Sequence, residues 1–136
     1  MKDGVVFQKL QSLQQALTEL RSPGVATSPD LQDDWRTQRA VKRDLQVLVE
    51  IVTDICQRLL TLHDQTPAPT SRHAGECCVQ LGVLSDDTAY RKMIQFRSSV
   101  VHRSEQVDVE ILVDMVNHRL TDFERFRSEV LAHAER

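Results

Sequence analysis

The feature that most constrains this chain is a long aliphatic stripe between about residues 30 and 64. Its members recur in alternating steps of four and three, which is the spacing of one face of an α-helix. They are Val41, Leu45, Leu48, Val52, Ile55, Leu59 and Leu62, with Val47 and Ile51 widening the stripe. A helix over this whole stretch would be roughly 50 Å long. That length and the a/d-like pattern predict a helix that overhangs a small core or packs against a second copy of the chain.

Shorter helices are predicted on both sides of this long one. The first ends at Pro23-Gly24, and Ser28-Pro29 is a candidate start for the long helix. A loop over 66–71 and a short helix over 72–81, closed by Gly82, come after it. The remaining apolar stripes are Leu10, Leu13, Leu17 and Leu20 in the first helix, Tyr90, Met93, Ile94, Val100 and Val101 in a helix that begins at Ser85-Asp86-Asp87, and Leu112, Val116, Leu120, Phe123, Phe126 and Val130 in a last helix that begins near Asp108.

The composition agrees with a helical protein. A length of 136 residues fits a single domain spanning 1–136. Four glycines and four prolines are too few for the many turns of a β-sandwich or barrel, and no stretch alternates with period two. We therefore predict an all-α, four- to five-helix up-and-down bundle with a long second helix.

The composition also excludes several classes of protein. With 40% hydrophobic and 27% charged residues the chain is too apolar to be disordered, and a net charge of −3 argues against a protein that coats nucleic acid broadly. No apolar run approaches the roughly 18 residues that span a bilayer, and the N-terminal stretch lacks the apolar segment of a secretory signal. Three cysteines, two of them adjacent, match no zinc pattern and predict reduced thiols. We expect a cytoplasmic protein with no metal, no cofactor and no membrane association.

One basic stretch stands out in this acidic chain. Residues 91–103 contain Arg91, Lys92, Arg97 and Arg103 and no acid. A solvated helix face is the ordinary explanation of such a run. The alternative rests on Arg97 and His102, which are separated by two serines and two valines. An arginine clamps a phosphate bidentately at any working pH, and a histidine exchanges protons near neutrality.

Such a pair suffices in principle to cleave RNA without a metal. His102 would activate the 2′-OH or protonate the leaving oxygen, and Arg97 would stabilise charge on the phosphate. On a regular helix the two positions lie about 140° apart around the axis and ~7.5 Å apart along it. Both can act on one phosphate only if the helix frays near His102 or if groups of two protomers meet in a shared cleft. The long second helix favours the shared cleft.

The stretch Phe96-Arg97-Ser98-Ser99-Val100-Val101-His102 resembles the Arg-x4-His motif of the HEPN superfamily, and specifically of its HepT-like branch. The resemblance implies a ribonuclease toxin that is paired with a minimal nucleotidyltransferase antitoxin. It extends over most of the chain and includes Leu45, Glu50 and Asp54 within the helix 39–60, the turn 81–84, and Leu120, Asp122 and Phe123 after the motif.

The sequence departs from the family pattern at two positions. The residue after the arginine is usually Asn or Asp in the family and is Ser98 here. Many HepT-like toxins carry, two residues after the histidine, a tyrosine that accepts AMP from the antitoxin, and this position is Ser104 here. Ser104 and Tyr90, the only tyrosine, are the candidate hydroxyls for such a modification.

Other polar residues are given supporting roles. Glu50 and Asp54, four residues apart, could form a paired-carboxylate site, but we expect them to orient basic groups such as Arg97. Ser98 is a possible hydrogen-bonding helper, and Arg91, Lys92 and Arg103 would attract the RNA backbone. Trp35 is interpreted as a core residue or interface anchor, because a chain with so few aromatics does not bind RNA mainly by base stacking. No two histidines have the spacing of a zinc site.

These observations lead to one main hypothesis and two rivals. The main hypothesis is a homodimeric toxin that cleaves RNA at an Arg97/His102 cleft, leaves a 2′,3′-cyclic phosphate and is restrained by a nucleotidyltransferase. The first rival is a catalytically weakened module that only binds this partner, which the two serines would suit. The second is a plain interaction bundle that shares the architecture alone.

Overall fold

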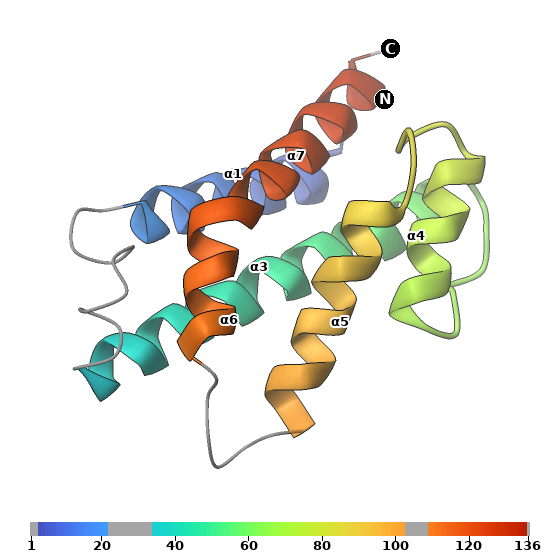
Figure 1. Ribbon diagram of the computed structural model, residues 1–136. Helices are drawn as coiled ribbons and strands as arrows, with labels where there is room; N and C mark the ends of the chain where they lie inside the picture. Colours follow the sequence, from blue (N-terminus) through green and yellow to red (C-terminus); the bar gives the residue numbers. More distant parts are fainter. Residues whose placement is uncertain (1–2, 22–33, 103–108, 136) are drawn as a thin grey trace.

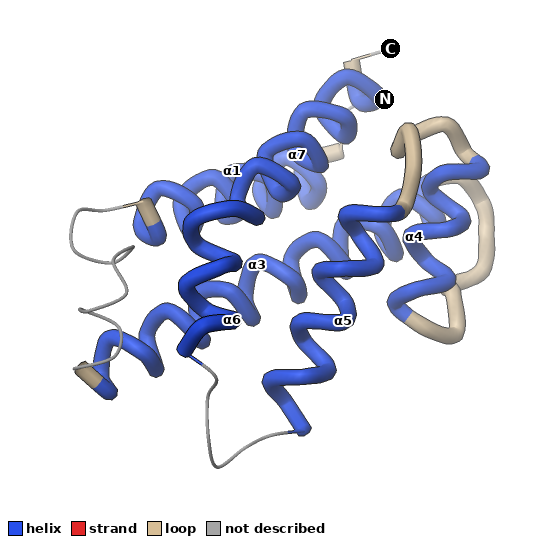
Figure 2. The backbone as a smooth tube through the Cα atoms, viewed as in Figure 1, coloured by secondary structure: helices blue, strands red, loops and turns tan. Residues whose placement is uncertain are grey.

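The computed structural model describes residues 3–21, 34–102 and 109–135, with the backbone alone for 98–102. Over these residues the chain forms helices joined by turns and no strand, which confirms the all-α class (Figures 1 and 2). None of the described helices combines the length and the apolar character that a membrane span needs. The elements are α1 (Gly4–Leu20), α3 (Trp35–Leu62), α4 (Ser71–Gln80), α5 (Thr88–His102), α6 (Val109–Asp114), the π-helical segment η1 (Met115–Arg119) and α7 (Leu120–Ala134).

The long helix α3 is the centre of the bundle, and α1, α4, α5, α6 and α7 all contact it. In Figure 1, α3 crosses the middle of the molecule. Its predicted stripe is buried, except that Leu62 at its end and Val47 and Ile51 at its margin are only half-buried. The helix has 28 residues, or about 42 Å, and is shorter than predicted. It begins at Trp35 because the Asp34 side chain accepts hydrogen bonds from the backbone N–H groups of Arg36 and Thr37, while Ser28-Pro29 lies outside the described residues.

Both ends of α1 are fastened to neighbouring helices by polar contacts. Asp3 caps α1 by accepting from the Val6 N–H, and it also accepts from Arg58 of α3 at 2.9 Å. The hydrogen bond from Arg58 is the main reason that the pKa of Asp3 lies below its ordinary value. Arg21, just after α1, forms an ion pair with Glu124 of α7. α1 thus packs between α3 and α7, with all four predicted leucines buried.

The last predicted helix is interrupted. Its apolar stripe is buried as expected, but η1 separates α6 from α7. A π-helical turn contains an extra residue, so that the adjacent Met115 and Val116 both face the core. Arg119 and Asp114 form an ion pair at 3.8 Å across this segment. Neither glycine nor proline marks the interruption, so nothing in the sequence announces it.

Candidate functional site

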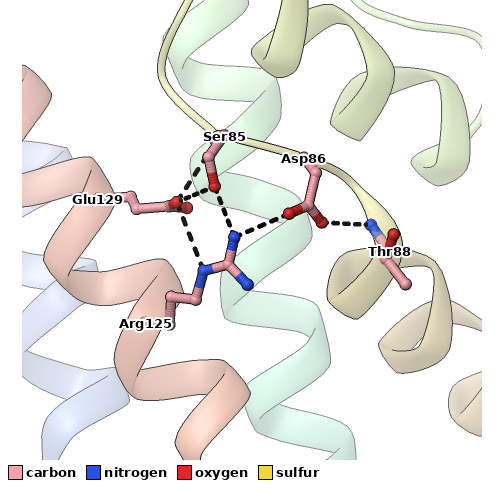
Figure 3. Close-up of polar contacts among 5 residues, drawn as sticks. All are labelled: Ser85, Asp86, Thr88, Arg125 and Glu129. Carbon is pink, nitrogen blue, oxygen red and sulfur yellow. Dashed lines mark hydrogen bonds and ion pairs between the residues drawn. The ribbon is translucent and has the colours of Figure 1, made fainter.

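Helix α5, which carries the basic stretch, is fixed at its beginning by a polar cluster with α7 (Figure 3). Arg125 donates to the Ser85 hydroxyl at 2.5 Å and to the Asp86 carboxylate at 2.8 Å. The Ser85 hydroxyl donates to Glu129, and Asp86 also accepts from the Thr88 N–H at the start of α5. The hydrogen bond from Arg125, followed by that from Thr88, holds the pKa of Asp86 below its ordinary value. We call Ser85, Asp86, Arg125 and Glu129 the α5–α7 clamp.

One turn further along, Tyr90 locks α5 against α4. Its ring lies over Gly75, where a Cβ atom would be only 2.3 Å from the ring, so that only glycine fits this crossing. Its hydroxyl donates to the Ser71 carbonyl at 2.6 Å, and burial raises its pKa. Tyr90 was a candidate for modification, but the side chain is 2% exposed and its hydroxyl is already engaged. Tyr90 is therefore a core residue, and its burial argues against its role as a modification site.

The apolar face of α5 continues through Met93 and Phe96, both buried against the core. Arg97 follows directly and is half-buried. Within the described residues its guanidinium has no carboxylate within ion-pair distance. A cation held at a partly buried position without a counterion is available for an anionic ligand.

His102 is the last residue of α5, so one continuous helix carries both positions of the motif. The backbone of α5 is helical through His102, which favours the shared cleft over a helix that frays before this residue. Arg97 and His102 consequently occupy positions about 140° apart on this helix. The side chains of Ser98 and His102, and all of Arg103 and Ser104, lie outside the described residues.

Comparison with known proteins gives the family. The family model of the ribonuclease HepT-like proteins matches residues 13–130, which is most of the chain. The chain belongs to the ribonuclease HepT-like family. The sequence resemblance is thereby confirmed. No match was found among curated proteins.

Solved structures show that the HepT-like chain shares its fold with known toxins. A toxin–antitoxin structure with AMP-PNP has a TM-score of 0.86 at 20% identity, over 96% of this chain and 99% of the other. The tri-AMPylated Shewanella oneidensis HEPN toxin in complex with its MNT antitoxin gives the same values. A mutant of the toxin–antitoxin pair MntA–HpeT has a TM-score of 0.84 at 21% identity, over 96% and 99%. At this identity the likeness establishes the fold.

The other basic residues of α5 are distributed around the helix. Arg91 and Lys92 are exposed, six and five residues before Arg97, and therefore lie about 120° and 140° from it around the axis. Arg91 is also paired with Asp87 at 3.6 Å. The basic stretch of this HepT-like chain is not a single positive face.

The structure does not bring the carboxylates of α3 to Arg97. Glu50 and Asp54 are exposed, and Asp54 pairs with Lys9 of α1 at 3.4 Å. The sequence suggested that Asp54 pairs with Arg97, but no described contact joins them. Helix α1 packs along this side of α3, and its Lys9 ammonium pairs with Asp54 instead. No described contact joins Glu50 to Arg97 either.

Two features of the HepT-like chain were not anticipated from the sequence. His63 at the end of α3 and His133 in α7 place their Nε2 atoms 3.1 Å apart, although 70 residues separate them. Trp35, expected in the core or at an interface, is 57% exposed at the start of α3, with Arg36 and Arg39 against its ring. Only the three-dimensional pairing reveals the first feature. The second has a sequence signal, because the arginines follow Trp35 at one and four residues.

All three cysteines of the chain lie within the described residues. Cys56 and Cys78 are buried and Cys77 is half-buried, all as free thiols. A hydrogen bond with Cys78 and burial raise the pKa of Cys56, which keeps this thiol protonated and unreactive. The described residues contain no cluster of three or more His, Cys, Asp or Glu side chains suited to a metal ion.

Proposed function

We propose that the chain is the toxin of a toxin–antitoxin pair and acts as a metal-independent endoribonuclease. Membership of the ribonuclease HepT-like family supports the RNA substrate. The observation that carries the site assignment is Arg97, which is half-buried on α5 with no described counterion and five residues before His102.

In the proposed reaction the substrate's own 2′-OH attacks the adjacent phosphorus. The O2′–P bond forms, the P–O5′ bond breaks, and the products are a 2′,3′-cyclic phosphate and a 5′-hydroxyl. His102 removes the proton from the 2′-OH or supplies one to the departing O5′. Arg97 clamps the phosphate and offsets the charge that develops on it, while Ser98 is a possible hydrogen-bonding helper.

The active unit in this proposal is a homodimer. The two positions of the motif diverge on one uninterrupted helix, so a single phosphate is reached most simply by Arg97 of one protomer and His102 of the other. A chain that stays monomeric at micromolar concentration while cleaving RNA would contradict the shared cleft. Analytical ultracentrifugation measures this directly.

The partner in this proposal is a minimal nucleotidyltransferase antitoxin. The structural neighbours include an AMPylated toxin bound to an MNT antitoxin, and this chain shares their fold. Because Tyr90 is buried, Ser104 is the remaining candidate acceptor of AMP. Co-expression with such a partner followed by intact-mass measurement is expected to show an AMP adduct that Ser104→Ala abolishes. An unmodified chain would contradict modification at this position.

The decisive test of the activity is RNA cleavage by the purified chain in excess chelator. Wild type is expected to produce cyclic-phosphate ends, and Arg97→Ala and His102→Ala are expected to be inactive. Arg72→Ala removes an exposed charge that is paired with Glu76 on the neighbouring helix α4, and it serves as the matched control. Absence of cleavage by a folded dimer would favour the alternative, in which Ser98 and Ser104 mark a module that retains only partner binding.

A further inference from the structure

A second group of cationic residues lies at the start of α3, away from the catalytic motif in the sequence. At about 100° per residue, its members fall within an arc of about 120°, on the side opposite the buried Val41 and Leu45. Most of them are exposed, and Lys42 is half-buried. We call this group the Trp35 surface, and it consists of Trp35, Arg36, Arg39, Lys42 and Arg43.

The cations of the Trp35 surface are unpaired within the described part of the chain. None of its four basic side chains has a described carboxylate within ion-pair distance. By contrast, most other described cations do form ion pairs. These paired residues are Lys9, Arg21, Arg58, Arg72, Arg91, Arg119 and Arg125.

The described acids near this surface, Asp34 and Asp44, form no ion pair with its cations and interact with them only through their charge. Asp34 accepts hydrogen bonds from Thr37 and from the Arg36 N–H, and these bonds, with a smaller contribution from the charge of Arg36, lower its pKa. Asp44 is half-buried and forms no ion pair with this surface. Burial and then the charge of Glu19 raise its pKa, while the charge of Arg43 partly offsets this. Asp30 and Asp33 precede α3 in the sequence and lie outside the described residues.

Trp35 holds two of these cations in place without consuming their hydrogen-bond donors. The guanidinium carbons of Arg36 and Arg39 lie 5.3 and 4.9 Å from the centre of the indole ring. A cation–π contact uses the charge and the face of the guanidinium, whereas a phosphate binds to the N–H groups at its edge. The indole therefore reduces the conformational freedom of both arginines while their N–H groups remain available to an anion.

We propose that the Trp35 surface binds the phosphate backbone of single-stranded RNA outside the catalytic cleft. This inference rests on the proposed function, since it assigns a second contact for the same substrate. RNA suits the surface better than a protein partner does. Trp35 and Val5 are the only large apolar side chains exposed in the described residues, so no other exposed large apolar side chain described there joins Trp35 in a hydrophobic centre of a protein interface.

The test is the affinity for RNA as a function of salt concentration. A fluorescein-labelled single-stranded RNA of roughly 20 nucleotides, a length that exceeds one binding site, is titrated with the full chain while anisotropy is recorded. All proteins carry His102→Ala so that the RNA stays intact. The variants are Arg36→Gln/Arg39→Gln, Trp35→Ala and Trp35→Phe. The matched control is Arg72→Gln/Arg119→Gln, which removes the same number of charges from residues that are paired with carboxylates.

The double variant of the Trp35 surface is expected to weaken binding about 25-fold at 0.1 M salt and to reduce the salt slope by about 1.4, the loss of two phosphate contacts on a single strand. Trp35→Ala is expected to weaken binding several-fold, and Trp35→Phe to retain most of the affinity because it keeps an aromatic face. The control is expected to change the affinity less than threefold. Because the substituted residues are exposed, or half-buried at the surface in the case of Arg119, all variants should keep the melting temperature of the His102→Ala parent within about two degrees.

Several outcomes would overturn the proposal. If the double variant and the control lost the same affinity for RNA, the effect would be one of net charge and not of this surface. If the chain bound no RNA at low salt, RNA would not be the ligand of this surface. Loss of binding to a nucleotidyltransferase with unchanged RNA affinity would make this surface a protein interface. If the chain with His102 intact cleaves no RNA but the salt-dependent loss persists, the proposed activity fails and the Trp35 surface remains an RNA-binding site.

Discussion

Helix α5 and the first turns of α3 both carry several basic residues, but they present them in opposite ways. On α5 the cations point in different directions, and Arg91 is already paired with Asp87. On α3 they share one face, and no described carboxylate pairs with them. Counting basic residues along the sequence identifies only α5 as a candidate anion-binding region. The arrangement of the side chains in space also identifies the start of α3. Arg97 matters because of its half-buried, unpaired position on α5 rather than because of the positive stretch around it.

The two regions also differ in how firmly they are held. α5 is fixed by the α5–α7 clamp at its start and by the crossing of Tyr90 over Gly75. The start of α3 is held by the Asp34 cap and by packing of its buried face, while Trp35 projects into solvent. This difference suits a catalytic helix that must be positioned and a binding surface that needs only to present charge.

The largest effect should come from α5. Arg97→Ala and His102→Ala are each expected to lower the rate of RNA cleavage at least 100-fold, since each removes a group that acts in the transition state. Arg36→Gln/Arg39→Gln should leave the rate at saturating RNA nearly unchanged and raise KM. Single-turnover and steady-state kinetics on a labelled RNA separate these effects. A larger loss of kcat in the α3 variant than in Arg97→Ala would reverse the comparison.

The second effect concerns stability. Gly75→Ala is expected to destabilise the chain by about 1–3 kcal/mol, because the new methyl group would overlap the Tyr90 ring and force the α4–α5 crossing apart. Gly4→Ala is the control, since a Cβ at Gly4 meets no atom within 4 Å. Urea denaturation followed by circular dichroism measures both. If Gly75→Ala were as stable as wild type, the tight crossing would not be what positions α5.

The third prediction compares the contributions to RNA binding of a paired and an unpaired cation on α5. Lys92→Gln is expected to reduce the salt slope of RNA binding by about 0.7 if this exposed ammonium contacts a phosphate. Arg91→Gln should reduce it less, because Arg91 must first leave Asp87 at 3.6 Å. Anisotropy titrations over a range of salt concentrations provide the comparison. Equal slopes for the two variants would show that pairing does not decide availability.

The smallest effect is a pH dependence of the α5–α7 clamp. The folded pKa of Asp86 lies below its ordinary value of 3.8, chiefly because of Arg125. The clamp therefore contributes stability above pH 3.8 and loses this contribution as the pH falls through the folded pKa. Asp86→Asn should cost stability near neutral pH and progressively less below about pH 4. Thr61→Ala removes a hydroxyl that donates to the Gln57 carbonyl, neither of which titrates, and its cost should not depend on pH. Urea denaturation at several pH values tests this, and a pH-independent cost of Asp86→Asn would exclude the ion pair as its cause.

Much of the fold follows from local patterns in the sequence. The alternating steps of four and three specify the buried face of α3, and Gly82 ends the α4 region with a positive φ of 79° as predicted. The long helix was predicted to begin near residue 30, but α3 begins at Trp35, where the Asp34 side chain accepts hydrogen bonds from the N–H groups of Arg36 and Thr37. The π-helical segment had no local signal, since it depends on which side chains the neighbouring helices bury.

For the candidate site, too, some features could be predicted from the sequence and others only from the structure. The sequence by itself determined the helical class and the family. It also selected Arg97 and His102 as the proposed catalytic pair, because that choice depends on their spacing along one helix. Only the tertiary structure decided that Tyr90 is buried, that Asp54 meets Lys9 and that the cations of the Trp35 surface have no described counterion. Exposure and ion pairing depend on residues from distant parts of the chain, so no local pattern encodes them.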